Sequence, residues 1–403
     1  MGMISLRNAG HRAGELLFSN LNLVIGDGDH VGLVAPNGRG KSTLLRAMAG
    51  LLELSEGEVT RSRGLAVGYV PQEVPEASLG MSLRDFVGSV LDADTLESEG
   101  WRIDVVLDEL SFPEEVKDKR LAELSGGWQR MALLARCWVT QPDALILDEP
   151  TNHLDLGRIM MLEEWLSYAA GSLPVVIASH DRAFLDATTN RTLFLRPSEQ
   201  VYLPLSYSAA RAELDQVDAA AEAQRERDLK QAAQLRKQAA KLTNVGINSG
   251  SDLLTVKSKQ LRDRAEKIET AVQEVHRDRT GLVKLGNSGA EARVMMTFDN
   301  IVISTPDGRA LFKVDKLHIF QGDRIVLLGR NGTGKSQFMR VVTEALGGKA
   351  VPGLKVSPQV VPGYLDQALA WLPLEPSPLD YLLHRFDEGD RRILGARNGG
   401  PRA

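Results

Sequence analysis

Hydrophobic positions in the N-terminal half of the chain fall into short runs bounded by glycine and proline. Residues 3–6 and 21–25 are expected to form amphipathic strands, and residues 30–35 a buried strand after a turn at 26–29. A further apolar run, at 145–147, ends in the adjacent acids Asp148 and Glu149. Short continuous apolar runs are typical of parallel strands buried on both faces, so the pattern predicts an α/β fold.

A glycine-rich loop connects the run at 30–35 to a helical pattern at 44–48. This order of strand, loop and helix is the context of a phosphate-binding loop, in which backbone N–H groups face an anion. The pattern G-x-x-x-x-G-K-[ST] fits except at its first position, Ala35. Lys41 would add a charge at the β- and γ-phosphates, and Ser42 would bind Mg²⁺. The predicted nucleotide-binding residues are Asn37, Gly38, Gly40, Lys41, Ser42 and Thr43.

Further polar residues follow predicted strands. Asp148 and Glu149 lie where open α/β sheets bind ligands, at the carboxyl end of a strand, and Gln72 ends another strand. The segment Leu-Ser-Gly-Gly-Trp-Gln-Arg at 124–130 precedes a helical run at 131–139, with Ser125 as the expected N-cap. Each feature alone is compatible with an ordinary solvated loop or capped helix.

Taken together, the phosphate loop, Gln72, the segment at 124–130, Asp148-Glu149 and residues 179–182 resemble the nucleotide-binding domain of the ATP-binding cassette (ABC) superfamily. More narrowly, residues 148–155 and 179–186 resemble the ABC-F family. This resemblance implies a P-loop ABC fold, ATP and Mg²⁺ as cofactors, and hydrolysis by positioning and charge neutralisation.

The resemblance also implies residue roles. Glu149 polarises the hydrolytic water, His180 steadies the γ-phosphate, and Gln72 and Asp148 contact the metal or its waters. Asp155 communicates across a dimer of cassettes. The segment formed by Ser125, Gly126, Gly127 and Gln129 caps a nucleotide held by the opposite cassette. An aromatic residue that stacks on adenine is expected before the phosphate loop, where His11 is the nearest candidate.

Residues 207–280 form a different kind of segment. Ala, Glu, Gln, Arg and Lys dominate residues 209–242 without proline or glycine, which predicts a long helix. Glycines and an asparagine at 243–251 predict a turn, and residues 253–279 predict a second helix, so that the two form an antiparallel hairpin. Its base is acidic, whereas its tip is rich in basic residues, among them Lys237, Lys241, Lys257 and Lys259.

From about residue 293 the chain repeats its beginning, which predicts a duplicated domain. Residues 325–328 parallel the buried strand residues 31–34 and are expected to form a strand before a second phosphate loop at 329–336, whose first glycine is intact. Gln367 repeats Gln72 at nearly the same offset. The predicted site comprises Asn331, Gly332, Gly334, Lys335, Ser336 and Gln367, with Ser336 as a Mg²⁺ ligand. We predict three domains: a first cassette at 1–206, the hairpin at 207–280 and a second cassette at 293–403.

The second cassette is expected to be incomplete, because residues 293–403 contain no second Leu-Ser-Gly-Gly segment, no second Asp-Glu strand and no second switch histidine. No complete site would then form within one chain, and turnover would be weak. Two first cassettes could instead pair head to tail between chains, as a homodimer.

Composition restricts the location and the partners. The single cysteine, Cys137, fits a reducing compartment and core packing, and no apolar stretch is long enough for a membrane span, so we expect a cytoplasmic protein. Because the net charge is −5, contact with nucleic acid requires a local basic patch such as the hairpin tip. In the ABC-F family such a hairpin reaches into the ribosome toward tRNA, which makes the ribosome the expected partner.

Three functions are compatible with the sequence. The leading hypothesis is an ABC-F-type ATPase that acts on the ribosome, in translation or in antibiotic resistance. An energising subunit of a membrane transporter is the first alternative, and a nucleotide-dependent ribosome or RNA binder with little hydrolysis is the second.

Overall fold

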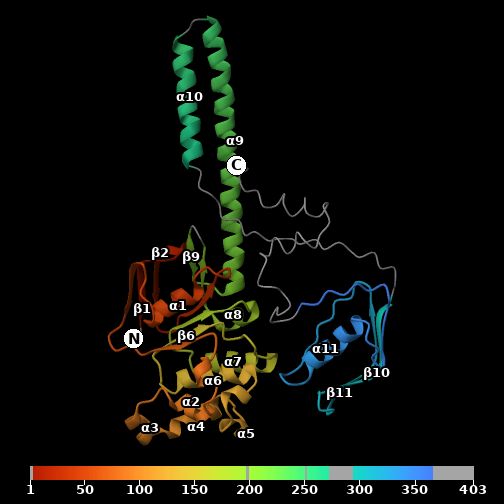
Figure 1. Ribbon diagram of the computed structural model, residues 1–403. Coiled ribbons are helices and arrows are strands. Elements are labelled where there is room, and N and C mark those ends of the chain that lie inside the picture. Colours follow the sequence, from red (N-terminus) through yellow and green to blue (C-terminus); the bar gives the residue numbers. More distant parts are fainter. Residues whose placement is uncertain (1–2, 197–198, 250–251, 272–293, 366–403) are drawn as a thin grey trace. The chain divides into compact units, whose positions relative to one another are not determined.

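The computed structural model describes residues 3–196, 199–249, 252–271 and 294–365. The chain divides into two compact units (Figure 1). The first comprises Met1–Val283 and Leu328–Gly332, and the second comprises Lys284–Leu327 and Thr333–Ala403. We describe each unit by itself.

A six-stranded sheet with the order β5-β6-β7-β3-β8-β9 forms the centre of the first unit. Adjacent strands of this sheet run parallel, except that β9 is antiparallel to β8. The four inner strands consist almost entirely of buried residues, because helices and a second sheet cover their two faces. The strands are β3 (His30–Val34), β5 (Val67–Val70), β6 (Ala144–Asp148), β7 (Val175–Ala178), β8 (Arg191–Leu195) and β9 (Gln200–Leu203).

An antiparallel sheet with the order β2-β1-β4 lies in the same unit. Its strands are β1 (Ile4–Ala13), β2 (Glu15–Ile25) and β4 (Glu56–Arg61). The first two are longer than predicted and form one hairpin that turns at Gly14, whose φ of +76° favours glycine. Apolar residues of this sheet, of helix α1 (Lys41–Ala49) and of one face of the central sheet form one hydrophobic core.

The other face of the central sheet carries the larger core, to which α2, α4, α6, α7, α8 and the start of α9 (Tyr207–Ser249) contribute. Helix α6 packs against α2, α4 and β5, and α7 packs against α8. The α-helices are α2 (Leu83–Gly88), α3 (Ala93–Glu99), α4 (Trp101–Glu109), α5 (Glu114–Lys117), α6 (Gly126–Trp138), α7 (Leu156–Tyr168) and α8 (Arg182–Thr188). Short 3₁₀ turns lie at Glu76–Ser78 and Leu121–Glu123.

The predicted helical hairpin is present as α9 (Tyr207–Ser249) and α10 (Asp252–Ala271), which lie side by side (Figure 1). The prediction of a turn over 243–251 is wrong, because α9 continues to Ser249. The hydroxyl groups of Thr243 and Ser258 lie 2.6 Å apart, and Ser258 donates to the carbonyl of Ala239. These contacts join α9 to α10 close to the glycine of this segment, which costs a helix about 1 kcal/mol. Residues 272–279 of the predicted second helix lie outside the described residues.

The second unit contains a three-stranded antiparallel sheet with the order β11-β10-β12 and one helix. The elements are β10 (Val294–Ser304), β11 (Ala310–Phe320), β12 (Leu354–Val356) and α11 (Lys335–Leu346). A small core centred on Phe298 and Ile303 joins the sheet to the helix. Residues 325–328, expected to repeat the buried strand before the phosphate loop, form no strand, and all are exposed. That expectation is wrong for the residues that the structure describes.

Candidate active site

The first phosphate loop has the backbone shape that its glycines permit. Gly38 and Gly40 have φ angles of +75° and +84°, a region that side chains with a Cβ rarely adopt. Gly40 is the N-cap of α1. A side chain at this position would meet Leu17, because a Cβ added to Gly40 would lie 3.0 Å from the Cβ of Leu17. The loop connects the end of β3 to the N-terminus of α1. The N–H groups of the first helical turn, which have no partner within the helix, therefore face the loop.

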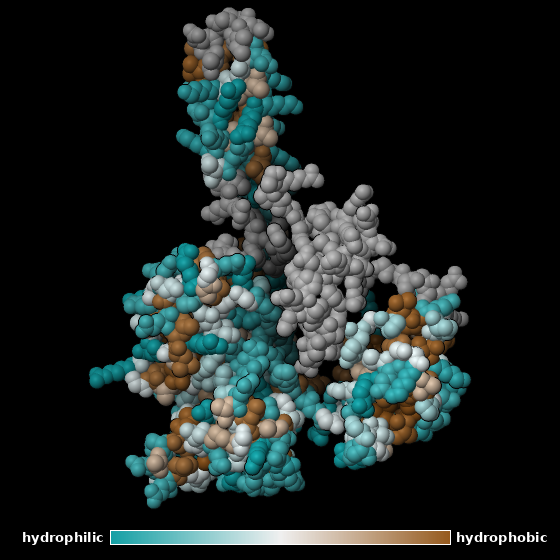
Figure 2. Space-filling model, in the orientation of Figure 1, coloured by the Kyte–Doolittle hydropathy of each residue, from teal (hydrophilic) through white to brown (hydrophobic). Residues whose placement is uncertain are grey.

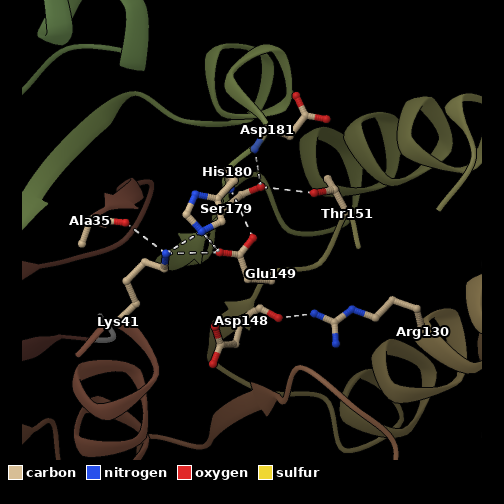
Figure 3. A network of polar contacts seen from close by, with 9 residues as sticks. All are labelled: Ala35, Lys41, Arg130, Asp148, Glu149, Thr151, Ser179, His180 and Asp181. Carbon is tan, nitrogen blue, oxygen red and sulfur yellow. Dashed lines mark hydrogen bonds and ion pairs between the residues drawn. The ribbon is translucent and has the colours of Figure 1, made fainter. Parts of the chain in front are cut away.

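Lys41 lies at the centre of the polar network (Figure 3). Its Nζ donates to the carbonyl of Ala35 at 3.0 Å, lies 2.7 Å from Nε2 of His180 and lies 3.5 Å from Oε1 of Glu149. A lysine ammonium only donates, so Nε2 of His180 accepts in this arrangement. Because the contact uses the backbone carbonyl of Ala35, the lysine keeps this hydrogen bond although the motif expects glycine at this position.

Glu149 follows directly after β6 and has a φ of +50°, which is unusual for a residue with a side chain. Its Oε2 accepts from the backbone N–H of His180 at 3.2 Å, and its Oε1 lies 3.1 Å from Nε2 of that histidine. Oε1 is buried, pairs with the Lys41 ammonium only as an ion pair at 3.5 Å, and accepts no hydrogen bond among the described residues. The carboxylate is therefore fixed through one oxygen and offers the other to a ligand.

Asp148 is the last residue of β6, and its side chain is buried. The Tyr69 hydroxyl donates to its Oδ2 at 3.4 Å, and burial raises the pKa of this phenol, so that it remains a donor. Oδ1 of Asp148 is buried without a hydrogen-bond partner in the described part of the chain. An unsatisfied carboxylate oxygen beside a phosphate loop fits Mg²⁺, which prefers oxygen ligands.

A cavity of about 600 Å³ brings these groups together. Ser42, Thr43 and Gln72 also line it, so it contains every residue predicted for the first phosphate loop and all three predicted catalytic residues. Sequence reasoning missed Ala13 and Leu17, which carry no motif and reach the cavity only through folding. It gave no role to Asn152, which belongs to the motif at 148–155. The lining residues are Ala13, Leu17, Pro36, Asn37, Gly38, Gly40, Lys41, Ser42, Thr43, Gln72, Asp148, Glu149, Asn152 and His180.

His11, the predicted adenine-stacking candidate, does not line this cavity. Its Nδ1 lies 3.3 Å from the Ser55 hydroxyl. Two aliphatic side chains, Ala13 and Leu17, border the cavity from the same β1–β2 hairpin. Aliphatic contacts from Ala13 and Leu17 could take the place of aromatic stacking on the base. No sequence motif indicates these two residues.

Among the described residues, no group of three His, Cys, Asp or Glu side chains could hold a metal ion by itself. Mg²⁺ in such a site keeps waters and binds oxygens of the substrate phosphates in addition to one or two protein groups. The predicted ligands Ser42, Gln72 and Asp148 line one cavity, in agreement with that chemistry.

The segment at 124–130 forms the start of α6, as predicted. The Ser125 hydroxyl caps the helix by accepting from the N–H of Trp128, and Gly126 and Gly127 form its first turn. Gln129 holds the preceding loop, because its amide donates to the carbonyl of Leu121 at 2.8 Å. None of these residues lines the cavity at Lys41. Their role against a nucleotide of another cassette stays a prediction.

Asp155 has a local structural role. It is the N-cap of α7, and its Oδ1 accepts from the N–H of Arg158 at 3.0 Å. Communication across a dimer, which the resemblance implied for this residue, stays a prediction.

The second phosphate loop has the same local backbone. Gly332 and Gly334 have φ angles of +82° and +100°, and Gly334 is the N-cap of α11, which begins at Lys335. Ser336 lies in the first turn of that helix. Gln367, predicted to complete this site, lies outside the described residues.

Comparison with known proteins agrees with this geometry. Residues 18–152 match the family model described as ABC transporter. ABC transporter F family member 5 of Arabidopsis thaliana is 29% identical over 388 residues, which cover 84% of this chain and 54% of that protein. ATP-binding protein Uup of Haemophilus influenzae is 29% identical over 428 residues, which cover 94% of this chain and 62% of that protein.

Among solved structures, a nucleotide-free ATP-binding cassette from an ABC transporter is similar over 53% of this chain and 96% of that chain, with 18% identity and a TM-score of 0.45. This chain spans a little over half the length of the curated relatives named above. The resemblance deduced from the motifs is confirmed: residues 18–152 match the ABC transporter family model within an α/β fold, and the relatives that cover most of this chain include a member of the ABC transporter F family.

Proposed function

We propose that the first unit binds ATP with Mg²⁺ and hydrolyses it at Glu149. The observation that carries the proposal is the convergence of Lys41, Glu149 and His180, from three distant parts of the sequence, in one cavity with the phosphate loop (Figure 3). A buried lysine opposite a buried glutamate and a histidine is suited to a polyphosphate and an attacking water.

Binding would use groups that the fold has already oriented. The N–H groups at the start of α1 and the Lys41 ammonium would hold the β- and γ-phosphates. Ser42, Gln72 and Asp148 would hold Mg²⁺, which supplies charge neutralisation at the β- and γ-phosphate oxygens. Lys41 would exchange its contact with His180 for the phosphate, and the imidazole, in the tautomer that carries its proton on Nε2, would then donate to the γ-phosphate.

Hydrolysis would depend on Glu149. Its Oε2 is held by the N–H of His180, so its Oε1 has a fixed position from which to accept a hydrogen bond from a water. Orientation of that water in line with the γ-phosphate and acceptance of its proton are the two tasks of a general base. The buried position of the carboxylate strengthens both, because water screens it little.

Steady-state ATP turnover of the wild-type chain and of Glu149→Gln tests this proposal. The amide keeps the shape of the side chain but cannot accept a proton, so turnover should fall by about 10²-fold or more while ATP affinity is retained. Equal turnover in the two proteins would contradict the assignment. The same measurement tests the prediction of weak turnover in this chain.

We propose further that the chain acts on the ribosome through the hairpin of α9 and α10. The two helices pack through small buried residues, Ala232, Ala239 and Ala265, so their outer faces are free for a partner. Figure 2 shows mainly hydrophilic residues on the hairpin surface. Its basic tip lysines, Lys237, Lys241, Lys257 and Lys259, are all exposed, as a phosphate-binding surface requires.

Co-sedimentation with ribosomes, with and without ATP, tests this second part. Reversal of the four tip lysines to glutamate should weaken binding and reduce its dependence on salt. A matched control reverses four exposed lysines of the second unit, Lys313, Lys316, Lys349 and Lys355, which gives the same change in charge. Equal loss of binding in both variants would show that only total charge matters and would remove the tip from the proposal.

Two further predictions concern partners. Among the described helices, none combines the length and apolar character needed to cross a membrane. If the chain instead energised a transporter, it would not sediment with ribosomes. Pairing of two first cassettes between chains also stays a prediction, and turnover per chain that is independent of protein concentration would exclude it.

A further inference from the structure

Arg130 is a buried charged residue for which the proposed mechanism has no role. It lies in the second turn of α6, after the glycines of the segment at 124–130, and only 4% of its surface is exposed. Its guanidinium reaches the edge of the active site, where one nitrogen donates to the backbone carbonyl of Asp148 and the other to that of Pro71 (Figure 3 shows the contact with Asp148).

The two carbonyls mark the point where two neighbouring strands end. β5 and β6 run parallel, with Val70 opposite Leu147, so Pro71 and Asp148 are the next pair along the sheet. Proline has no N–H with which to extend the ladder, so Pro71 and Asp148 cannot form the hydrogen bond that would continue the pairing of β5 with β6. The planar fork of a guanidinium can donate to both carbonyls at once, which a single ammonium cannot do with the same geometry.

Each carbonyl immediately precedes an active-site residue. Gln72 follows Pro71, and Glu149 follows Asp148, and all of these side chains except Pro71 line the nucleotide cavity. A shift of either carbonyl therefore moves the side chains proposed for Mg²⁺ and for water. Arg130 connects the backbone of both to α6, the helix that begins at Ser125.

Arg130 is held by backbone carbonyls, and no carboxylate of the described residues forms an ion pair with it. Within the described residues the guanidinium forms no ion pair, and its Nε is buried without an acceptor. Burial lowers the pKa of Arg130 to about 10, although the negative charges of Asp148 and Glu149 oppose this shift. A buried cation without an ion pair is costly to the fold, so stability alone does not explain it. Residues that violate such rules are concentrated at functional sites.

We propose that Arg130 is a positioning residue that fixes Gln72, Asp148 and Glu149 relative to one another for Mg²⁺ binding and hydrolysis. It touches neither the cavity nor the substrate site and acts through the backbone of the two strand ends. This inference rests on the proposed function, because it assigns Arg130 a task in that same hydrolytic site.

The test is Arg130→Lys, compared with Arg136→Lys on the same helix. Arg136 is half-buried, and its guanidinium lies over the ring of Phe86, 5.0 Å from the centroid, away from the strand ends. Lysine keeps the charge but loses the fork, so Arg130→Lys should lower kcat by roughly 10- to 100-fold, the cost of a misplaced catalytic group. The ATP concentration for half-saturation should change little, because the phosphate loop is untouched.

The dependence of ATP binding on Mg²⁺ concentration distinguishes a positioning role from a merely structural one, because loss of fold stability alone would not change it in a folded chain. Arg130→Lys should require a several-fold higher Mg²⁺ concentration for half-maximal ATP binding, whereas Arg136→Lys should match the wild-type chain. Circular dichroism and thermal unfolding establish that both variants are folded. If Arg130→Lys does not fold, Arg130→Gln, which keeps two neutral donors in place of the cation, replaces it in the same assays.

The outcomes separate this inference from the proposed function. Wild-type turnover no greater than that of Glu149→Gln would refute hydrolysis at Glu149, and Mg²⁺-dependent ATP binding in the Arg130→Lys chain would still test the positioning role. A folded Arg130→Lys chain with unchanged kcat and unchanged Mg²⁺ dependence would overturn the inference. So would equal losses in Arg130→Lys and Arg136→Lys, which would indicate a general effect of α6 packing.

Discussion

The two phosphate loops of this chain have nearly the same local backbone but different surroundings. Both place two glycines at positive φ and begin a helix at the motif lysine, Lys41 or Lys335. The first loop follows β3, a buried central strand, whereas residues 323–330 before the second loop form no strand and are exposed. Lys41 is buried against Glu149 and His180, which arrive from β6 and from the segment after β7.

This difference separates what a motif encodes from what a fold supplies. The loop shape follows from neighbouring residues, since glycine alone adopts these angles freely. The residues proposed as the acid, the histidine and the metal ligand lie at the ends of strands paired side by side, β6 with β7 and β7 with β3. A phosphate loop is therefore a local structure, and a hydrolytic site is a property of the parallel sheet that surrounds it.

The largest expected effect comes from the two motif lysines. Lys41→Met should lower ATP turnover by about 10²- to 10³-fold, because it removes a charge aimed at the phosphates within a buried site. Lys335→Met should leave turnover within about 3-fold, an effect of less than 1 kcal/mol. Turnover measured under identical conditions checks both variants, and a greater loss from Lys335→Met would break the comparison.

Next in size is the effect of one core residue before each loop. Leu33 in β3 is fully buried, so Leu33→Ala should lower the free energy of unfolding by about 2–5 kcal/mol. Leu327 is 39% exposed, so Leu327→Ala should change it by about 0.5 kcal/mol. Urea denaturation of each variant measures this. A large loss for Leu327→Ala would show that the residues before the second loop are packed as those of β3 are.

The glycines should behave alike in the two loops. At Gly40 and Gly334 an alanine must adopt a positive φ, and its Cβ would lie 3.0 Å from a Leu17 atom or 2.6 Å from a Leu311 atom. Strain of this kind costs on the order of 1–3 kcal/mol at each position. Thermal unfolding of Gly40→Ala and Gly334→Ala checks it, and a neutral result at either glycine would contradict the shared backbone geometry.

The smallest effect concerns Cys137, which lies in the first unit and is the chain's single cysteine. Burial raises the pKa of its thiol to about 12. Below about pH 9 both the folded and the unfolded chain keep this proton, so the contribution of the buried thiol to the free energy of unfolding is fully present. Above it only the unfolded chain loses the proton, and the free energy of unfolding of the first unit falls by up to about 1.4 kcal/mol per pH unit.

Denaturation at pH 8 and at pH 10 measures this loss, with Cys137→Ala as the control from which the thiol contribution is absent. Labelling by a thiol reagent at pH 8 should be slow in the folded chain, because the thiolate is the reactive form. Fast labelling would show that the first unit opens around α6 and would weaken the contrast between the two units.

Much of the candidate site could be predicted from sequence, because its residues belong to motifs with local geometry. The phosphate loop, the acids after β6 and the cap at Ser125 each depend on a few consecutive residues. Ala13 and Leu17 could not be predicted, because only the pairing of β1 with β2 brings them to the cavity. Arg130 was recognised only as part of a motif, since its contacts with two strand ends are invisible without the fold.

Two errors in the predicted elements have physical causes. The turn placed at 243–251 relied on helix propensities, which packing against α10 overrides. The strand placed at 325–328 relied on apolar composition and on the repeat of the first unit. An apolar run becomes a buried strand only when other strands pair with it, and in the described part of the second unit none does.

The most direct test of the central claim is the identity of the nucleotide bound after a single turnover. Wild-type chain and Glu149→Gln are each loaded with ATP and Mg²⁺, freed of unbound nucleotide and analysed over time. If hydrolysis takes place in the first unit, the wild-type chain converts its bound ATP to ADP and Glu149→Gln retains ATP. ADP formed at the same rate in both proteins would show that the chemistry does not depend on Glu149 and would contradict the claim.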